Sequence, residues 1–207
     1  YAPSIATSAR PAVARQMAAY TGLSEQFILE HDLRILPTEF RLELLRDRRQ
    51  VIGELDTRFV GNMGDMRLGY DPSGTGVFPG ITAGLHEYMI NELRFQIGLQ
   101  YRRAVSAFDR FDFRRTNGSP FANYGDDLAN AMKANPNLLV YSLNGIYDLS
   151  TVFYGADYDY LHLRIPENVK KNLRYEYYPS GHMAYVDRPV LQAMTRDIAR
   201  CYDEAAR

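Results

Sequence analysis

One aspartate and one histidine in the C-terminal third of the chain have types and positions that suit proton transfer. Asp148 comes shortly after the apolar run 138–143, and His182 comes shortly after the run 174–178. A histidine can take the proton of an attacking hydroxyl, and a carboxylate bonded to it fixes its tautomer and stabilises the imidazolium. Asp148 and His182 are therefore candidates for the acid and the base of a catalytic triad.

The nucleophile that would complete this triad has no obvious counterpart in the sequence. A nucleophilic serine on a strand-to-helix turn is typically found in Gly-x-Ser-x-Gly, and this pattern occurs nowhere in the 207 residues. Ser73 lies in Asp-Pro-Ser-Gly and Ser119 in Asn-Gly-Ser-Pro, both of which are typical of turns. Ser180 lies two residues before His182, in the same predicted turn. We therefore expect a chain that carries the acid and the base without their nucleophile.

Two predicted strands with flanking helices would position the pair. The run 138–143 is nearly all apolar, as in a strand buried on both faces, and 174–178 is a second strand. Helices are predicted over 124–134, over about 151–163 and after Pro189. This alternation predicts a parallel sheet, at whose carboxyl end the loops that follow neighbouring strands meet. The chain order of aspartate then histidine is also that of α/β-hydrolases.

The first 120 residues show a different pattern, in which helical spacing dominates. Residues 49–60 indicate extended chain, and the glycine-rich stretch 61–80 predicts a long loop with a turn signal at residues 70–74. Helices are expected within 1–22, after an N-cap at Ser24, over about 37–48 and over 82–96. We place a boundary near 118–122, between a mostly helical region (1–120) and two β-α units (121–207).

Composition and charge argue against several classes of function. The chain has 24 Lys and Arg against 25 Asp and Glu, scattered along its length, so no nucleic acid or anionic membrane is expected as a partner. No stretch approaches 18 consecutive apolar residues, so no membrane span is predicted. The single cysteine, Cys201, excludes an intrachain disulfide and a zinc site built on several cysteines. No metal or organic cofactor is indicated.

The other histidines suit structural roles better than catalysis. His31 ends a predicted helix, where capping or exposure is expected, and His162 ends an aromatic helix. His86 has no second ligand three or four residues further along its predicted helix, so a metal site there is not expected. Asp148 and His182 therefore stay the only pair with a chemical interpretation.

The segments around both residues carry a more specific signal. Residues 144–153 read Asn-Gly-Ile-Tyr-Asp-Leu-Ser-Thr-Val-Phe, and residues 177–185 read Tyr-Tyr-Pro-Ser-Gly-His-Met-Ala-Tyr. They resemble Asn-Gly-Tyr-Tyr-Asp-Leu-Ala-Thr-Pro-Phe and Tyr-Tyr-x-x-Gly-His-Met-Met-Tyr of bacterial proteins in the serine carboxypeptidase family. Val152 departs from the usual proline and Ala184 from a common second methionine, and neither residue does proton chemistry. The resemblance extends upstream, to residues 20–24, 40–47, 52–59 and 70–73.

The resemblance implies an α/β-hydrolase fold, of which this chain would hold the helical cap and the last two parallel strands with their helices. It implies a serine-type carboxypeptidase that removes C-terminal residues from peptides through an acyl-enzyme. Asp148 would orient the histidine, His182 would act as general base and then general acid, and Met183 would contact substrate on the leaving-group side. The family's serine and oxyanion hole precede the cap, so the missing N-terminal half of the fold would be this chain's partner.

Several alternatives stay open at the level of sequence. An esterase or acyltransferase would use the same triad, and a non-catalytic binding protein could derive from such a hydrolase. Because the chain begins at Tyr1 without a signal region, we expect a processed or truncated chain, or one half of a nicked two-chain enzyme. The family implies a periplasmic or secreted location.

Overall fold

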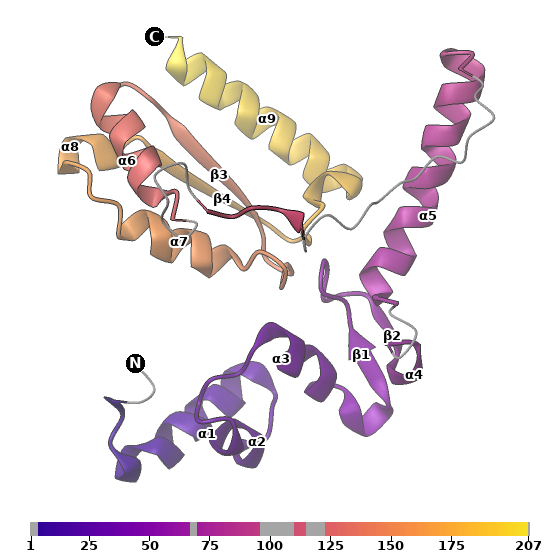
Figure 1. Ribbon diagram of the computed structural model, residues 1–207, viewed down its shortest axis with the longest axis vertical. Helices are drawn as coiled ribbons and strands as arrows, with labels where there is room; N and C mark the ends of the chain where they lie inside the picture. The colour runs from indigo at the N-terminus through magenta and orange to yellow at the C-terminus, as the bar shows by residue number, and fades with distance from the viewer. Residues whose placement is uncertain (1–3, 67–69, 96–109, 115–122, 207) are drawn as a thin grey trace. The chain divides into compact units, whose positions relative to one another are not determined.

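The computed structural model describes residues 4–66, 70–95, 110–114 and 123–206, as mixed helix and strand (Figure 1). The chain divides into two compact units, each assembled from three stretches. The first unit comprises Tyr1–Val77, Gly145–Val152 and Tyr178–Val190, and the second comprises Phe78–Asn144, Phe153–Tyr177 and Leu191–Arg207. The boundary predicted near 118–122 lies outside the described residues, and the division into cap (1–120) and core (121–207) stays a prediction.

The first unit begins with helices that the sequence predicts well. The helices are α1 (Arg10–Thr21), α2 (Glu25–Glu30) and α3 (Pro37–Glu43), and a 3₁₀ turn, Thr7–Ala9, precedes them. Ser24 caps α2 as predicted, because its Oγ accepts the backbone N–H of Phe27 at 3.1 Å. Gly22 ends α1 at a φ of 76°, a conformation that glycine adopts without strain. Ala14, Leu23, Ile28 and Leu33 form the buried core between these helices.

A short hairpin and a long helix follow α3 and the 3₁₀ turn Arg46–Arg48. Strand β1 (Gln50–Ile52) pairs antiparallel with β2 (Val60–Asn62), with Val51 opposite Gly61, so the extended chain predicted over 49–60 is confirmed at its two ends. Helix α4 (Met63–Met66) comes next, and α5 (Pro72–Glu87) leads into a π-helical turn, Tyr88–Glu92.

The prediction of a long loop over 61–80 is wrong, and its physical reason lies at Asp71. The Oδ1 of Asp71 accepts the backbone N–H groups of Ser73 at 3.0 Å and Gly74 at 3.2 Å, and Pro72 is the first residue of α5. Aspartate followed by proline starts a turn and also starts a helix, because both need a side-chain acceptor and a fixed φ. The glycines further along therefore lie inside a helix, not in a loop.

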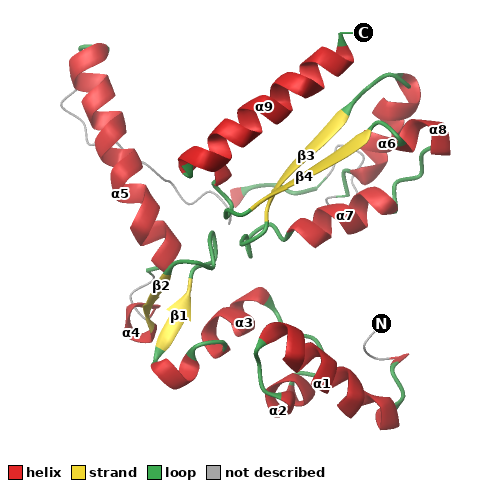
Figure 2. Ribbon diagram, turned by 180° about the vertical axis from the view of Figure 1, so that it is seen from behind, coloured by secondary structure: helices red, strands yellow, loops and turns green. Residues whose placement is uncertain are grey.

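The second sheet consists of the two strands expected to carry the candidate pair. Strands β3 (Val140–Gly145) and β4 (Leu173–Tyr178) lie side by side (Figure 2). The N–H of Val140 donates to Asn172 O at 3.0 Å, and further along the N–H of Ile146 donates to Tyr178 O at 2.9 Å. Both chains advance together between these two bonds, so the strands are parallel, as predicted.

Helices cover this sheet on both sides. They are α6 (Gly125–Ala134), α7 (Phe153–Leu161) and α9 (Arg188–Ala205), close to the predicted ranges, and the short α8 (Glu167–Lys170), which was not predicted. Figure 1 shows α9 on one side of the two strands and α6 and α7 on the other. No helix in the described ranges is long and apolar enough to cross a membrane.

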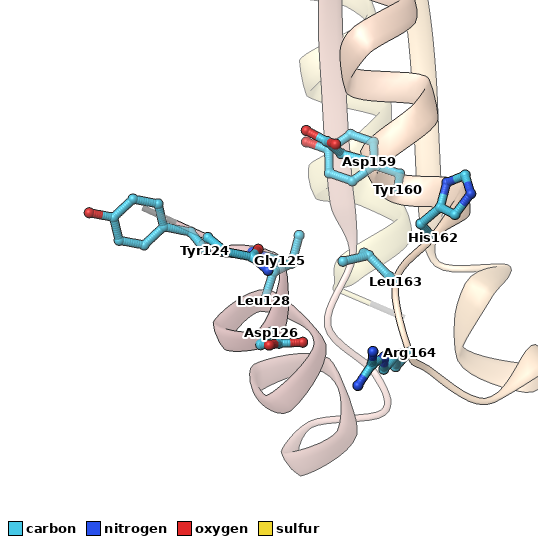
Figure 3. Close-up of a pocket in the computed structure, with 10 residues that line it drawn as sticks. Tyr124, Gly125, Asp126, Leu128, Asp159, Tyr160, His162, Leu163 and Arg164 are labelled. Carbon is cyan, nitrogen blue, oxygen red and sulfur yellow. The ribbon is translucent and has the colours of Figure 1, made fainter. Parts of the chain in front are cut away.

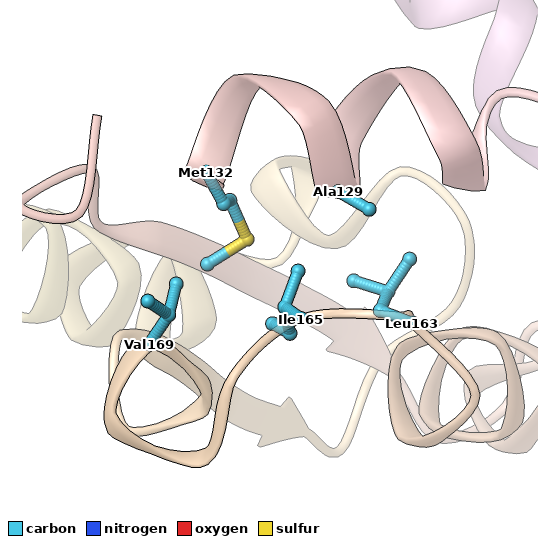
Figure 4. Packing of buried hydrophobic residues seen from close by; sticks show 5 residues of the cluster. All are labelled: Ala129, Met132, Leu163, Ile165 and Val169. Atoms are coloured by element: carbon cyan, nitrogen blue, oxygen red, sulfur yellow. The ribbon is translucent and has the colours of Figure 1, made fainter. Parts of the chain in front are cut away.

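The second unit contains both a hollow and a core between α6 and the chain that follows α7. A cavity of about 680 Å³ opens where α6 begins, and Leu163 reaches toward it (Figure 3). The core lies next to it: Met132 of α6 faces Ile165 and Val169, and Ala129 lies above Leu163 (Figure 4). Met132 is completely buried, so this cluster anchors the chain between the two parallel strands.

Candidate functional site

Asp148 and His182 meet within the first unit. The Nδ1 of His182 lies 2.9 Å from the Oδ2 of Asp148. A carboxylate can only accept a hydrogen bond, so Nδ1 carries the proton and donates it, and Nε2 of the neutral ring keeps its lone pair. The side chain of Asp148 is 6% exposed and that of His182 is 41% exposed. A buried acid thus holds an outward-facing base in the tautomer that can accept a proton from a nucleophile.

The turn after β3 fixes the carboxylate of Asp148. Its Oδ1 accepts the backbone N–H groups of Ser150 at 2.8 Å and Thr151 at 2.9 Å. Two backbone donors restrain the rotation of a carboxylate. The second oxygen is therefore left pointing at His182.

Two glycines let the loops after β3 and β4 come into backbone contact. The N–H of Tyr147 donates to Ser180 O at 3.0 Å. A Cβ on Gly145 would lie 2.3 Å from Gly181 O, and a Cβ on Gly181 would lie 2.2 Å from Leu55 O. Such distances leave no room for a methyl group, so glycine at both positions permits the approach.

A third segment, residues 53–58, ties the two loops together, and we call it the bridging loop. It follows β1 in sequence and contacts the segments that carry Asp148 and His182. Its backbone makes three hydrogen bonds to them: His182 N–H to Leu55 O at 2.6 Å, Leu149 N–H to Glu54 O at 3.0 Å, and Thr57 N–H to Tyr147 O at 3.0 Å. The bridging loop thus fixes the backbone on either side of the pair.

A buried arginine of α3 anchors the bridging loop through hydrogen bonds. Arg41 is 3% exposed and donates through Nε to Ile52 O at 3.1 Å and through Nη1 to Glu54 Oε2 at 2.6 Å. Its Nη2 donates to the carboxylate of Asp71. A charge this deeply buried is tolerated only when paired, which both carboxylates provide.

Asp71 links this anchor to α5. Its Oδ2 accepts the N–H of Glu54 at 2.9 Å, and Ser73 Oγ donates to Oδ1 while accepting the N–H of Leu55 at 3.1 Å. Burial alone would raise the pKa of Asp71, but the hydrogen bonds from Ser73, Glu54 and Gly74 and the charge of Arg41 together lower it. The Asp71–Ser73 pair is thus a structural clamp on the bridging loop.

The described part of the chain brings no nucleophile to the free side of the histidine. His182 Nε2 has no hydrogen-bond partner among the described residues. Ser73 is completely buried in the clamp, and Ser180 is 1% exposed with its Oγ accepting from Arg58. Ser119 lies outside the described residues. The structure therefore joins the candidate acid to the candidate base, and none of the described residues brings a hydroxyl to Nε2 of His182.

Met183 lies at the edge of a small cavity in the first unit. The cavity has a volume of about 220 Å³, enough for one side chain, and its apolar walls include Leu55, Phe59, Val77 and Val186. Asp56, Arg58 and Asp187 supply its polar part. The predicted pocket role of Met183 is compatible with this position and stays a prediction.

Two of the other histidines, His31 and His162, are engaged in local contacts, and His86 is exposed on α5. His31 Nδ1 lies 2.8 Å from Phe27 O, with its ring stacked on that of Phe27. His162 Nδ1 lies 2.6 Å from Tyr158 O, and this residue borders the cavity of the second unit. Within the described ranges, no group of three His, Cys, Asp or Glu side chains is placed to hold a metal ion.

Sequence reasoning found the pair but missed the parts that hold it. The signal that could have indicated the bridging loop was its own resemblance to the serine carboxypeptidase family over residues 52–59. No protein-family model, curated protein or solved structure matches this chain. What points to a function is therefore the pair of segments 144–153 and 177–185, together with the contact between Asp148 and His182.

Proposed function

We propose that Asp148 and His182 are the acid and base of a serine-type carboxypeptidase with an α/β-hydrolase fold. The observation that carries the proposal is the 2.9 Å contact between His182 Nδ1 and a buried Asp148 carboxylate, beyond the ends of two parallel strands. A single Asp or His after a strand is a common turn residue, whereas a buried acid bonded to an exposed base is the arrangement of a triad.

In this proposal the nucleophilic serine belongs to polypeptide outside these 207 residues. His182 Nε2 accepts the serine hydroxyl proton while the serine oxygen attacks the carbonyl of the last peptide bond. The imidazolium, stabilised by Asp148, then donates that proton to the departing amine, and a water deprotonated by the same nitrogen releases the acyl group. The steps need neither a metal nor an organic cofactor.

The fold is compatible with a nucleophile that lies outside these 207 residues. Parallel sheets are normally covered by helices and contain more than two strands. Strands β3 and β4 with helices on both sides are therefore consistent with the last two β-α units of a larger sheet, and the described helices within 1–120 with the cap. By the same resemblance, we propose a periplasmic or secreted location and the missing half of the fold as partner.

The proposal can be tested by comparing the 207-residue chain with a longer one that includes its upstream coding sequence. The substrates are an N-blocked dipeptide with a free C-terminus, its C-terminal amide and its ester. We expect no turnover from the 207 residues and release of the C-terminal residue by the longer chain. His182→Ala should lower kcat by about 10⁶ and Asp148→Asn by about 10⁴. His86→Ala, which changes an exposed histidine on α5, is the matched control.

The same assay separates the alternatives. Hydrolysis of the ester without the free peptide would indicate an esterase or acyltransferase. An upstream sequence without a serine that reacts with a fluorophosphonate would indicate a binding protein derived from a hydrolase. Peptidase activity of the purified 207 residues that disappears in His182→Ala would show that the nucleophile lies within them.

A further inference from the structure

Arg58 of the bridging loop has an acceptor in front of each of its five N–H groups. Nε donates to Asp56 Oδ1 at 3.0 Å, and Nη2 donates to Asp56 Oδ2 at 2.7 Å and to Ser180 Oγ at 3.3 Å. Nη1 donates to Pro179 O at 2.9 Å and forms an ion pair with Asp187 Oδ2 at 3.5 Å. A guanidinium has five N–H donors, so none is left over for a ligand.

The partners of Arg58 lie in the three segments that make up the candidate site. Asp56 belongs to the bridging loop, and Pro179 and Ser180 lead directly into His182. The guanidinium carbon also lies 5.1 Å from the centre of the Tyr147 ring, and Tyr147 immediately precedes Asp148. One side chain therefore contacts the loop of the acid, the loop of the base and the segment between them.

The charge of Arg58 is already compensated, which argues against a role in holding an anionic substrate. Asp56 is 7% exposed and forms a two-pronged contact with the guanidinium. Asp187 adds a second carboxylate on the other side. Two-pronged arginine–carboxylate contacts fix direction as well as distance. The arrangement is that of a clamp, not of a binding site with an unused cation.

We propose that Arg58 is a positioning residue, which holds the loop of His182 so that Nδ1 stays within reach of Asp148. The inference rests on the proposed function, because it takes Asp148 and His182 to be the working acid and base. A hydrogen bond of 2.9 Å weakens steeply when the partners separate or tilt. Loss of the clamp should thus free the imidazole to adopt its other tautomer, with the proton on Nε2, which cannot accept a proton from a serine.

Nuclear magnetic resonance of the 207-residue chain, with ¹⁵N-labelled histidine, measures this tautomer directly. Long-range ¹H–¹⁵N correlations distinguish Nδ1–H from Nε2–H, under alkaline conditions that favour neutral imidazole. The spectrum of Asp148→Asn is the reference for a histidine whose tautomer the carboxylate no longer fixes. Arg58→Lys keeps the charge but cannot reproduce a planar fork of donors. Arg46→Lys, in an exposed ion pair with Glu43, is the matched control.

We expect the Nδ1–H population of His182 to fall in Arg58→Lys by at least about half as much as it falls in Asp148→Asn. The reason is that lysine replaces the planar set of guanidinium donors by a single point charge. Arg46→Lys should match the wild type. If Arg58→Lys does not fold, Ser180→Ala removes one acceptor of the clamp, and a smaller loss in the same direction is expected. If the variant that folds, Arg58→Lys or otherwise Ser180→Ala, keeps the tautomer of the wild type, the role of Arg58 is overturned. A wild-type tautomer in Asp148→Asn as well would instead overturn the proposed function itself.

Discussion

Among single residues, the glycines beside the pair have the most direct structural consequence. A Cβ at position 181 would lie 2.2 Å from Leu55 O and 2.4 Å from Asp56 Cβ. These contacts involve backbone and a buried side chain, which have little freedom to move. A methyl group there must therefore push the loop of His182 away from the bridging loop.

We predict that Gly181→Ala lowers the free energy of unfolding by about 1–3 kcal/mol, the usual cost of overpacking. Urea denaturation followed by circular dichroism measures it. Gly155→Ala in α7 is the control, because nothing lies within 4 Å of a Cβ there. Alanine in a helix is favoured over glycine, so this control should be unchanged or slightly more stable. Equal stability of Gly181→Ala and the wild type would show that the loops are not in the contact described.

A tyrosine on β4 should titrate unusually late. Burial, and the hydrogen bond that Tyr177 donates to Asp157 at 2.8 Å, raise the pKa of Tyr177 from 10.0 to about 12. Because the folded pKa is raised, the stabilisation is complete below pH 10.0 and is lost as the pH rises through about 12. The difference in phenolate absorbance between wild type and Tyr177→Phe should show this late step, and Asp157→Asn should bring it to lower pH. A step near 10.0 in that difference would contradict the prediction.

The juxtaposition of Asp148 and His182 could be predicted from sequence because strand order and loop position determine it. The contacts of Leu55 and Arg58 could not, because they join residues far apart in the chain and leave no periodic pattern. Arg58 also looks like an ordinary surface charge in the sequence. Its role becomes visible only when Ser180 and Asp187 are seen beside it.

At the scale of elements, α5 shows how one dipeptide can mislead. Asp71 and Pro72 start a helix here, although the same residues are typical of a turn. Tertiary contacts decide between a turn and a helix, because the carboxylate of Asp71 also binds Arg41 and the N–H of Glu54. The helix therefore begins where a long-range anchor already exists.

This anchor predicts an acid-sensitive element. The pKa of Asp71 is lowered below 3.8, so its stabilisation is present above that pH and is lost as the pH falls through the folded pKa. Asp71→Asn should lower the free energy of unfolding at neutral pH by about 1–3 kcal/mol, as for a buried acceptor that loses its charge. The difference from wild type should shrink in acid. Urea denaturation across pH tests this, with the exposed Asp47→Asn as control, and a pH-independent difference would exclude the mechanism.

At the scale of the whole molecule, the candidate site is built from stretches that are far apart in the sequence. Asp148 and His182 lie in the first unit, whereas most of the strands that precede them belong to the second. The predicted division into two consecutive regions near residue 120 stays a prediction, since a pattern along the chain indicates only contiguous blocks. A unit assembled from three separate stretches has no such signature.

We predict that the three stretches of the first unit open as one cooperative group. Arg41→Met, which leaves Glu54 and Asp71 without their buried partner, should accelerate hydrogen exchange at the amides of Thr57, Leu149 and His182 together. Amides within α6 should keep their exchange rates. Exchange measured residue by residue by NMR tests this. Faster exchange at Thr57 alone would show that the bridging loop does not hold the other two segments.

The hydrogen bond from His182 N–H to Leu55 O has a consequence for modular engineering. Exchanging lids is an attractive way to change the specificity of a hydrolase, since the lid is treated as a removable accessory. Here the region predicted to be the lid contributes backbone to the seat of the histidine. A chimera whose donor sequence begins before residue 53 would replace residues 53–58 together with the rest of the lid. A chimera whose donor sequence begins after Phe59 would retain residues 53–58, and we expect only this one to keep the hydrogen bond between His182 and Leu55.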